Sequence, residues 1–458
     1  MAPIKLVTTI YISNISEDVW PFISAITDTQ AKAYEIEENA LLADRHLFST
    51  LGEENILLIL PSQIEPDFMA YFHELFNGKK IRIIVPKIHS GEICSDILKD
   101  PAIMTEIDKI VKISQKVEII SYSASLQFLN LIRSLKQKHT NIITPESPDE
   151  EDAWTVNFFG SKSGIRQLAQ QSVTYEPDFK MPEGLICMGL EDAAKIAANK
   201  YITEQGVVLK TNKGHSGAGV LIFRPGDLPL EYTACQVTIN ELLNKESYWK
   251  LFPIIIESYI PPNFNIGGGF PNVEFKILNN GRVDFLYYCG QRVTPQGIFK
   301  GVEINDESLN DRVAAQITDT GFFVGERLAK EGYRGHFDVD FISAKNGELY
   351  VTESNVRRTG GSHVYYTSVA LFGKDFMHQT YSLSNDGYPL PTNTQWSFRK
   401  LRTILSPILY KKSTKEGLVI VAANSVSRGN FYYIVFGRNK RRAGEIEQKM
   451  EELFKAST

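Results

Sequence analysis

The stretch GYRGHFDVDFISAKNGELYVTESNVRRTGG, residues 332–361, decides the fold of this chain. Two short runs of alternating apolar residues flank Asn346 and Gly347, a dipeptide typical of the type I′ turn of a β-hairpin. Centring the turn on this dipeptide fixes the register of the two strands. The predicted pairs are Lys345 with Glu348, Ile342 with Val351, Asp340 with Glu353, and Asp338 with Asn355.

This register predicts a face of the hairpin that is apolar near the turn and acidic farther out. Because side chains alternate across a strand, the face comprises Asp338, Asp340, Ile342, Leu349, Val351, Glu353 and Asn355. Directly opposed carboxylates destabilise a sheet, so a bound cation would relieve them, and oxygen ligands in one patch suit Mg²⁺. A solvated hairpin end whose charges point into water is the alternative, and the hairpin alone does not decide between the two.

Composition is typical of a globular protein with several domains. The chain has 458 residues, 43% of them hydrophobic, which is enough for roughly two to four domains with their own cores. The net charge of -5 and the pI of about 6.0 do not indicate a nucleic-acid surface. We find no signal peptide and no apolar run of about 18 residues that would predict a membrane span. The four cysteines lie far apart and are expected to be reduced thiols of a cytoplasmic protein, and the sequence leaves a homodimer open.

Strands and helices alternate through the first 150 residues or so. This order is typical of an α/β layer with a mainly parallel sheet. No G-x-G-x-x-G follows the first strand, so we expect a scaffold or substrate-side domain here rather than a dinucleotide site. The polar stretch at 145–152 is expected to be a linker. Strands are predicted at 5–12, 55–61, 80–86, 117–122 and 141–144, and helices at 68–76, 104–114 and 126–138.

The segment NFFGSKSGIRQLAQQ, residues 157–171, predicts a loop and a helix that Gly160 opens. Lys162 and Arg166 lie near the start of this helix, where a cation opposes the helix dipole. A contact between Lys162 and a phosphate would offset this unfavourable interaction with the helix dipole. An ordinary surface lysine is the alternative, and the segment alone does not separate the two.

The segment QGVVLKTNKGHSGAGVLIF, residues 205–223, predicts a loop that covers phosphates. The β-like runs 207–210 and 220–223 enclose several glycines, which let backbone N–H groups approach a phosphate. Lys210 ends the strand that leads into the loop. Because the loop joins two strands, it is not the P-loop that opens a helix. A flexible glycine hairpin without a ligand is the alternative, and the flanking charges favour the lid.

Residues 253–303 add further polar candidates. The buried-type strand at 253–260 stops at Glu257 and exposes backbone groups that suit an adenine edge. A second Asn-Gly hairpin follows, and Glu274 is expected to point outward on its first strand. Arg292 lies in the connection after it.

The remaining pattern is mixed. An amphipathic helix is expected at 310–331, leading into the acidic hairpin. Beyond the hairpin we expect a helix at 372–381, a proline-rich link at 388–391, a helix at 397–404, strands at 417–422 and 431–436, and a helix at 442–455. The basic cluster at 438–442 is expected to be solvated surface.

The order of these motifs resembles the ATP-grasp superfamily over about residues 157–361. The segment YRGHFDVDFISAKNGELYVTESNVR, which contains E-x-N-x-R, looks like the metal-binding end of biotin carboxylases. PNVEFKIL looks like the corresponding part of D-alanine–D-alanine ligases. The C-terminal segment GLVIVAANSVSRGNFYYIVFGRNKRRAGEIEQKMEEL is similar to the terminal domain of the pheganomycin-type peptide ligases.

The resemblance implies an α/β chain, α+β in its catalytic part, with three units. A Rossmann-like pre-ATP-grasp domain would span residues 1–152. An ATP-grasp domain would span 153–395, with a lid subdomain at about 172–258. A small C-terminal α+β subdomain would span 396–458.

The resemblance also implies site residues. Lys162 and Lys210 would contact the α- and β-phosphates of ATP, and Arg357 the γ-phosphate and acyl intermediate. The lid over the phosphates would comprise Lys213, Gly214, His215, Ser216, Gly217 and Gly219. Glu257, Ser258, Tyr259 and Ile260 would hold adenine, Glu274 would hold the ribose, and Asp340, Glu353 and Asn355 would bind Mg²⁺, with Mn²⁺ as an alternative ion.

One position departs from the resemblance. D-alanine–D-alanine ligases carry an arginine two residues before the metal-binding aspartate, where this chain has Asp338. Arg292, Arg357 or Arg358 would then supply the charge for the oxyanion. His215 and His336 lie near the implied site, and a structural role is expected for each.

The implied reaction is ATP-driven ligation of a carboxylate to an amine through an acyl phosphate, with release of ADP and phosphate. The substrates would be small molecules such as amino acids or short peptides, with neither a nucleic acid nor a membrane as partner. Another ATP-grasp reaction, such as carboxylation or phosphoryl transfer, is one alternative. A non-catalytic ATP-binding regulatory module is another, and the complete set of charged residues argues against it.

Overall fold

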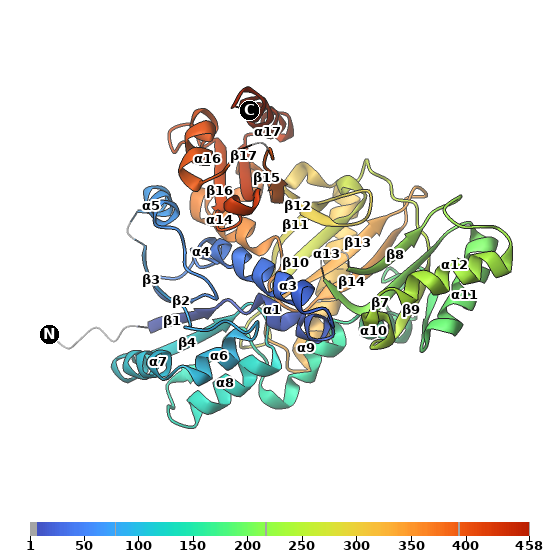
Figure 1. Cartoon of the computed structure of the whole chain (residues 1–458), viewed down its shortest axis with the longest axis horizontal. Coiled ribbons are helices and arrows are strands. Elements are labelled where there is room, and N and C mark those ends of the chain that lie inside the picture. Colours follow the sequence, from blue (N-terminus) through green and yellow to red (C-terminus); the bar gives the residue numbers. More distant parts are fainter. Residues whose placement is uncertain (1–6, 78, 216–217, 393, 458) are drawn as a thin grey trace.

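The computed structural model describes residues 7–77, 79–215, 218–392 and 394–457 (Figure 1). The described strands form sheets of five, eight and four strands. In Figure 1 the five-stranded sheet and the green four-stranded sheet lie at opposite ends of the molecule, with the eight-stranded sheet between them. Within the described residues, no helix combines the length and the apolar character needed to cross a membrane.

The first sheet is parallel throughout, which confirms the predicted α/β layer. Its order is β3-β2-β1-β4-β5, with β1 (Val7–Ile12), β2 (Asn55–Ile59), β3 (Lys80–Ile84), β4 (Lys116–Ser121) and β5 (Ile142–Ile143). The helices of this unit are α1 (Ile15–Asp18), α2 (Trp20–Ser24), α3 (Thr29–Leu41), the 3-10 helix η1 (Leu42–Arg45), α4 (His46–Ser49), α5 (Pro66–Leu75), α6 (Ile93–Lys99), α7 (Pro101–Ile113) and α8 (Leu126–Lys136). One core lies between the sheet and α6, α7 and α8. Because the sheet is parallel, the carboxyl ends of β1 and β4 lie at one edge and present Asp18 and Tyr122 to the middle of the molecule.

The central sheet carries the acidic hairpin at one end and the C-terminal strands at the other. Its order is β14-β13-β10-β11-β12-β15-β17-β16. The strands are β10 (Pro271–Ile277), β11 (Val283–Val293), β12 (Phe299–Ile304), β13 (Gly335–Ser343), β14 (Leu349–Asn355), β15 (Tyr381–Pro389), β16 (Gly417–Ala422) and β17 (Asn430–Gly437). The accompanying helices are α9 (Trp154–Phe159), α10 (Lys162–Ser172), α13 (Asp311–Lys330), α14 (Ser362–Phe372), α15 (Phe376–Gln379), α16 (Phe398–Leu405) and α17 (Lys440–Ser457).

The four-stranded sheet occupies the region predicted as a lid. Its order is β6-β9-β7-β8, with β6 (Gly184–Cys187), β7 (Val207–His215), β8 (Ala218–Phe223) and β9 (Ile254–Ser258). Helices α11 (Leu190–Glu204) and α12 (Tyr232–Asn244) pack on it, as their shared apolar core shows. β7 and β8 are longer than the predicted strands at 207–210 and 220–223, so the connection between them is shorter than predicted.

The C-terminal segment does not form a sheet of its own. β16 and β17 continue the central sheet, and one apolar core joins them to the first unit. Phe68 of α5, for example, lies edge-to-face against Phe398 of α16, with ring centroids 5.2 Å apart. The division into three domains stays a prediction, and the structure adds that the first and last segments share a core.

The acidic end of the predicted hairpin has the expected register, because two deviations near the turn offset each other. Asp338 pairs with Asn355 and Asp340 with Glu353. Near the turn the register differs by one residue, because Ala344 rather than Lys345 bonds to Glu348 and Gly347 adopts φ of 85°. A bulge between Asp340 and Phe341 then restores the predicted register.

The bulge makes part of the predicted face wrong. Val351 pairs with Phe341 instead of Ile342, and Leu349 pairs with Ser343. Val351, Leu349 and Phe341 therefore lie in the apolar core, away from the acidic side chains. The acidic side chains and these apolar side chains therefore lie on opposite faces of the sheet.

Two other predictions of local structure are wrong. The helix predicted at 372–381 is interrupted, because α14 ends at Phe372, a short α15 follows, and β15 begins at Tyr381. The stretch at 145–152 is not a free linker, because the side chain of Glu146 is only 3% exposed and pairs with Lys276 and Arg358.

Candidate active site

A cavity of about 360 Å³ lies where the three sheets and the C-terminal strands meet. The first unit contributes Asp18, Arg45 and Tyr122 to its wall, and the green sheet contributes Lys213 and Gly214. The central sheet contributes the acidic hairpin end and, on β15, Asp386. Residues that are hundreds of positions apart in the sequence therefore share one cavity.

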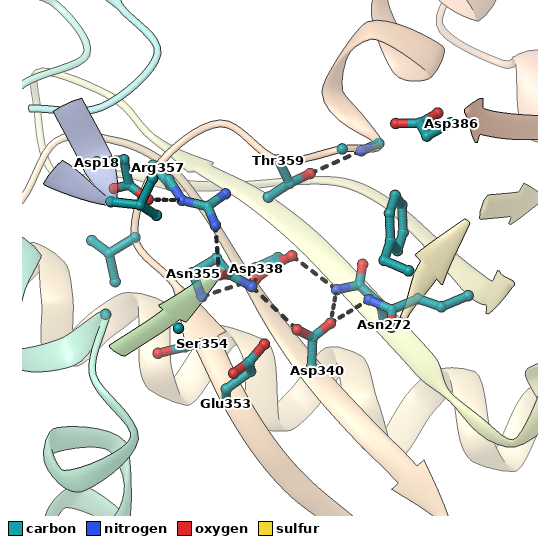
Figure 2. A pocket seen from close by; sticks show the side chains of 18 of the residues that line it. Asp18, Asn272, Asp338, Asp340, Glu353, Ser354, Asn355, Arg357, Thr359 and Asp386 are labelled. Atoms are coloured by element: carbon teal, nitrogen blue, oxygen red, sulfur yellow. Dashed lines mark hydrogen bonds and ion pairs between the residues drawn. The ribbon is translucent and has the colours of Figure 1, made fainter. Parts of the chain in front are cut away.

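Three carboxylates gather on one side of the cavity (Figure 2). This acidic cluster consists of Asp338, Asp340 and Glu353. Asn272 of β10 donates from its amide nitrogen to Asp338 and Asp340, at 3.0 and 2.7 Å. Asn355 donates to the same two aspartates, at 3.0 and 3.1 Å. The amides of Asn272 and Asn355 thus hold the two aspartates side by side, and Gln291 donates a further hydrogen bond to Asp340.

The acidic cluster carries more negative charge than its surroundings neutralise. Burial and the neighbouring Glu353 raise the pKa of Asp340 to about 7. Burial, Asp340 and Glu274 raise the pKa of Asp338 well above its usual range. Burial would also raise the pKa of Glu353, but Lys162, whose Nζ lies 2.6 Å from its carboxylate, lowers that pKa to about 2. An added cation would relieve the repulsion between these groups.

The donor set fits a hard cation. Asp340 and Glu353 are directly opposed, and Asn355 follows Glu353 on the same face of β14. The described residues contain no group of three or more His, Cys, Asp or Glu side chains arranged to hold a metal ion. That finding is compatible with Mg²⁺, which is often bound by one or two carboxylates together with substrate phosphates. Here the amide nitrogen of Asn355 faces the aspartates, so binding through its oxygen would require the amide to turn over.

The two predicted phosphate lysines are buried in ion pairs. Lys162, at the start of α10, is 9% exposed and lines the cavity, so the surface-lysine alternative is wrong. Lys210 lies 2.7 Å from Glu257, which also accepts from Arg166 at 2.6 Å. The Glu257 side chain is thus occupied, and the predicted adenine contacts at 257–260 lie outside the lining of the cavity.

The predicted lid reaches the cavity through Lys213 and Gly214. Lys213 donates from Nζ to the Asn157 amide oxygen at 2.5 Å, and burial lowers its pKa. Gly219 adopts φ of +81°, and a Cβ there would lie 2.4 Å from the Thr211 hydroxyl oxygen, so the Thr211 side chain packs directly against the glycine backbone. The predictions for Ser216 and Gly217 lie outside the described residues, as does the His215 side chain.

Arg357 is the predicted arginine that lines the cavity. Its guanidinium donates to Asp18 at 2.6 Å, to the Tyr122 hydroxyl at 3.1 Å and to the Asn355 amide oxygen at 3.0 Å. It also lies over the Tyr122 ring, 5.5 Å from the centroid. The first unit therefore orients this cation toward the acidic cluster.

Arg292 and Arg358, the other predicted sources of positive charge, do not line the cavity. Arg292 donates to Glu447 of α17 at 2.8 Å and to the Ser384 carbonyl oxygen at 3.0 Å. Arg358 is 4% exposed and lies between Glu146 and the rings of Tyr11 and Tyr366. Both arginines join distant segments of the fold.

The expected outward orientation of Glu274 is wrong. Its side chain is fully buried, and both carboxylate oxygens are occupied. His336, Tyr287, Thr359 and Ser362 contact it at 2.6 to 3.0 Å. No part of this carboxylate is available to a ribose, and His336 has the structural role that we expected.

Sequence reasoning missed several residues of the site. Asn272, Asp18 and Tyr122 orient the acidic cluster or Arg357, and Arg45 and Asp386 form the opposite wall. One signal was available, because Asp18 and Tyr122 follow β1 and β4 and the carboxyl ends of parallel strands often bind ligands. Arg45 and Asp386 offered no local signal.

Comparisons with known proteins agree with this geometry. No protein-family model matches the chain. The chain is 28% identical over 383 residues to an L-propargylglycine–L-glutamate ligase of Streptantibioticus cattleyicolor, covering 77% of this chain and 73% of that protein. It is 23% identical over 360 residues to a [butirosin acyl-carrier protein]–L-glutamate ligase of Niallia circulans, covering 77% and 72%.

Solved structures show the same fold at low sequence identity. Biotin carboxylase of Campylobacter jejuni superposes with a TM-score of 0.58 at 13% identity, over 96% of this chain and 89% of that one. N5-carboxyaminoimidazole synthetase of Staphylococcus aureus, complexed with ADP, superposes with a TM-score of 0.54 at 12% identity, over 98% of both chains. The fold is that of the ATP-grasp enzymes, with a Rossmann-like unit before it.

Within that superfamily, the sequence relatives are ligases that use L-glutamate, as their names state. In fold this chain resembles the ATP-grasp enzymes, and in sequence it is similar to these two ligases.

Proposed function

We propose that the protein joins a small carboxylic acid to an amine with ATP and Mg²⁺, through an acyl phosphate. The observation that carries the proposal is the convergence of the acidic cluster, Lys162, Lys213 and Arg357 on one cavity. An excess of buried negative charge faces several cations there, which is the arrangement that a metal–nucleotide complex would complete.

Each side chain has a role in this proposal. Bound Mg²⁺ would supply positive charge to the phosphate oxygens, and Asp340, Glu353 and Asn355 would hold it. Lys162 would exchange its contact with Glu353 for a phosphate when the cation neutralises that carboxylate. Lys213 would approach the phosphates from the lid and exclude water.

Arg357 would stabilise the charge that develops as the carboxylate attacks the γ-phosphate. Its contacts with Asp18, Tyr122 and Asn355 fix its position before substrates bind, so little reorganisation is needed during the reaction. An amine would then attack the acyl carbon, which forms the amide and releases phosphate. Arg357 would therefore supply the positive charge for the oxyanion, because this chain has Asp338 where D-alanine–D-alanine ligases carry an arginine.

Two observations favour ligation over the alternatives. The two curated relatives are named as ligases, whereas carboxylating neighbours are similar only in fold. A regulatory module would not need a buried excess of carboxylates, because each uncompensated buried charge costs stability. L-glutamate is the first candidate substrate, because both relatives act on it.

The test is ADP and phosphate release with a panel of amino acids and short peptides, including L-glutamate, in the presence and absence of Mg²⁺. We expect release to require Mg²⁺, a carboxylate and an amine. Lys210→Ala should weaken nucleotide binding and abolish turnover, because Lys210, which pairs with Glu257 and does not line the cavity in this structure, would turn to the phosphates when ATP binds. Lys195→Ala is the matched control, because Lys195 is exposed on α11 and pairs only with residues of its own helix.

Nucleotide binding without turnover for any acid and amine would favour the regulatory module. Turnover of the Lys210→Ala variant at the rate of the Lys195→Ala control would remove Lys210 from the mechanism.

A further inference from the structure

The wall of the cavity opposite the acidic cluster carries one carboxylate, Asp386. It lies on β15, and Figure 2 shows it apart from Asp340 and Glu353, beyond Thr359. Arg45 of η1 donates from Nη1 to Asp386 Oδ2 at 3.1 Å. The pair joins the first unit to the C-terminal half of the central sheet.

Asp386 has an unused acceptor. Its side chain is 7% exposed, yet Oδ1 has no hydrogen-bond partner among the described residues. The closest candidate, His363 Nε2, lies 3.9 Å away, which is beyond hydrogen-bond range. Burial and nearby Arg45 hold the pKa of His363 well below its usual range, so its ring is neutral and forms no ion pair.

A purely structural ion pair does not account for this arrangement. Buried carboxylate oxygens are normally satisfied, because an unpaired one loses its contacts with water and gains nothing. Glu146 and Glu274, in the same molecule, have both oxygens occupied, whereas Asp44, buried outside the cavity lining, also has one oxygen without a partner among the described residues. Asp386 differs from all three because its side chain lines the cavity, so a ligand could supply the missing donor once the carboxylate, whose Oδ1 is buried, turns toward it.

The chemistry of the vacant acceptor indicates which ligand group it takes. A carboxylate with one free oxygen accepts N–H donors, and a protonated amino group adds opposite charge to the hydrogen bond. Arg45 makes its one hydrogen bond among the described residues to Asp386, so the guanidinium also has N–H groups to spare. The wall around them is largely apolar, with Leu42, Phe299 and Val302.

We propose that Asp386 binds the ammonium group of the carboxylate substrate, which is therefore an amino acid or a peptide with a free amino group. The inference rests on the proposed function. The ammonium belongs to the acyl donor and not to the nucleophile, because the attacking amine must lose a proton and a paired carboxylate would hold that proton in place.

Hydroxylamine provides a test that does not depend on the natural amine. It attacks acyl phosphates and yields hydroxamates, so it reports which acids the enzyme activates. The acids are the protein amino acids, a set of dipeptides, and the counterpart of each that lacks the amino group, such as glutarate for L-glutamate. Wild-type protein and Asp386→Asn are compared at pH 8, and nucleotide binding by each confirms that the site is folded.

We expect wild-type protein to prefer amino acids or peptides to their counterparts, and Asp386→Asn to reduce that preference by roughly 10–100-fold, as for a lost hydrogen bond to a charged group. Hydroxamate formation from the counterparts should fall much less than that from the amino acids and peptides. Asp306→Asn is the matched control, because Asp306 is a surface carboxylate that pairs with His378 away from the cavity.

Equal use of acids with and without an amino group would overturn the inference and leave the ligase function standing. If Asp386→Asn keeps the wild-type preference for acids with an amino group, the inference is likewise overturned and the ligase function stands. Absence of hydroxamate from every acid, with ATP still bound, would instead contradict the proposed function, and the inference would fall with it.

Discussion

Two groups of buried charges meet where β10 pairs with β13, and they differ in how well their charges are balanced. The acidic cluster has raised pKa values at Asp338 and Asp340. The second group, here the balanced cluster, consists of Glu146, Glu274, Lys276, His336 and Arg358. Asp338 of the first group is the direct cross-strand neighbour of Glu274 of the second.

This difference distinguishes buried charges that stabilise the fold from buried charges that bind a ligand. In the balanced cluster each carboxylate has donors for both oxygens, and Arg358 and Lys276 hold the pKa of Glu146 far below its usual range despite burial. In the acidic cluster the amides of Asn272, Asn355 and Gln291 donate to the aspartates, but no cation among the described residues pairs with either aspartate. Burial alone is therefore uninformative, whereas a buried excess of one charge indicates a place for a ligand.

The largest expected effect is the loss of protein stability caused by a substitution in the balanced cluster. Glu146→Gln should lower the free energy of unfolding by about 3–5 kcal/mol, because Arg358 and Lys276 would stay buried without a counter-charge. Molecules that remain folded should keep their turnover. Chemical denaturation of the variant beside Glu150→Gln, an exposed glutamate of the same segment that pairs with Arg133, provides the comparison. Loss of turnover at full stability would place Glu146 in the site.

The acidic cluster should respond in the opposite way. Asp340→Asn should lower turnover by about 100-fold or more, because the proposed Mg²⁺ site would lose one of its ligands. It should also raise the melting temperature of the nucleotide-free protein at pH 8. The folded pKa of Asp340, about 7, lies above that of an unfolded aspartate, so its carboxylate costs stability increasingly from about pH 4 to pH 7.

The gain in melting temperature should therefore be small at pH 5 and complete at pH 8. Thermal melts at both pH values, with ADP release measured on the same sample, check both parts of this prediction. A variant that loses stability at pH 8 and keeps its turnover would show that the acidic cluster is a scaffold like its neighbour.

A pH titration extends the comparison to Asp386. Burial raises its pKa to about 6, in spite of the positive charges of Arg45 and Lys300. Its carboxylate is charged above that pH and neutral below it, and His363 stays neutral throughout this range. The preference for acids with an amino group should therefore fall as pH drops through 6, by about tenfold per unit at most. Asp386→Asn should lack this step, and a step of equal size in that variant would assign it to another group.

The smallest expected effect is on the lid. Hydrogen exchange along β7 and β8 should slow when a non-hydrolysable ATP analogue and Mg²⁺ bind, because Lys213 and Gly214 would close over the phosphates. Amides of β10 next to the balanced cluster should exchange equally slowly in both states. Mass spectrometry of the two segments gives the comparison, and unchanged exchange in β7 and β8 would argue against closure.

Much of this fold was accessible from the sequence because its signals are local. The helix at 310–331 and the strand at 417–422 follow hydrophobic patterns that α13 and β16 confirm. The acidic end of the hairpin was predicted in the right register because two local errors cancel, a longer turn and a bulge. A pattern of alternating residues contains no signal for either deviation.

The rest depended on contacts that the sequence does not encode locally. Arg45 and Asp386 are 341 positions apart, and neither lies in a recognisable motif. Glu274 was expected to point outward, because alternation predicts two faces but does not say that both are buried. The orientation of such residues is decided only when separate segments pack together.

The pairing of β15 has a consequence for synthesis on the ribosome. The strand pairing of β15 with β12 involves Ser382 and Leu383, near the start of β15, whereas β17 pairs with it as far as Pro389 and places Tyr432 opposite Asp386. Until residues 430–437 have left the exit tunnel, Asp386 has no cross-strand neighbour to hold it beside Arg45. A nascent chain that already carries residues 1–361 would therefore still lack the completed wall at Asp386, and the proposed selection of the acid would begin only after β17 has docked.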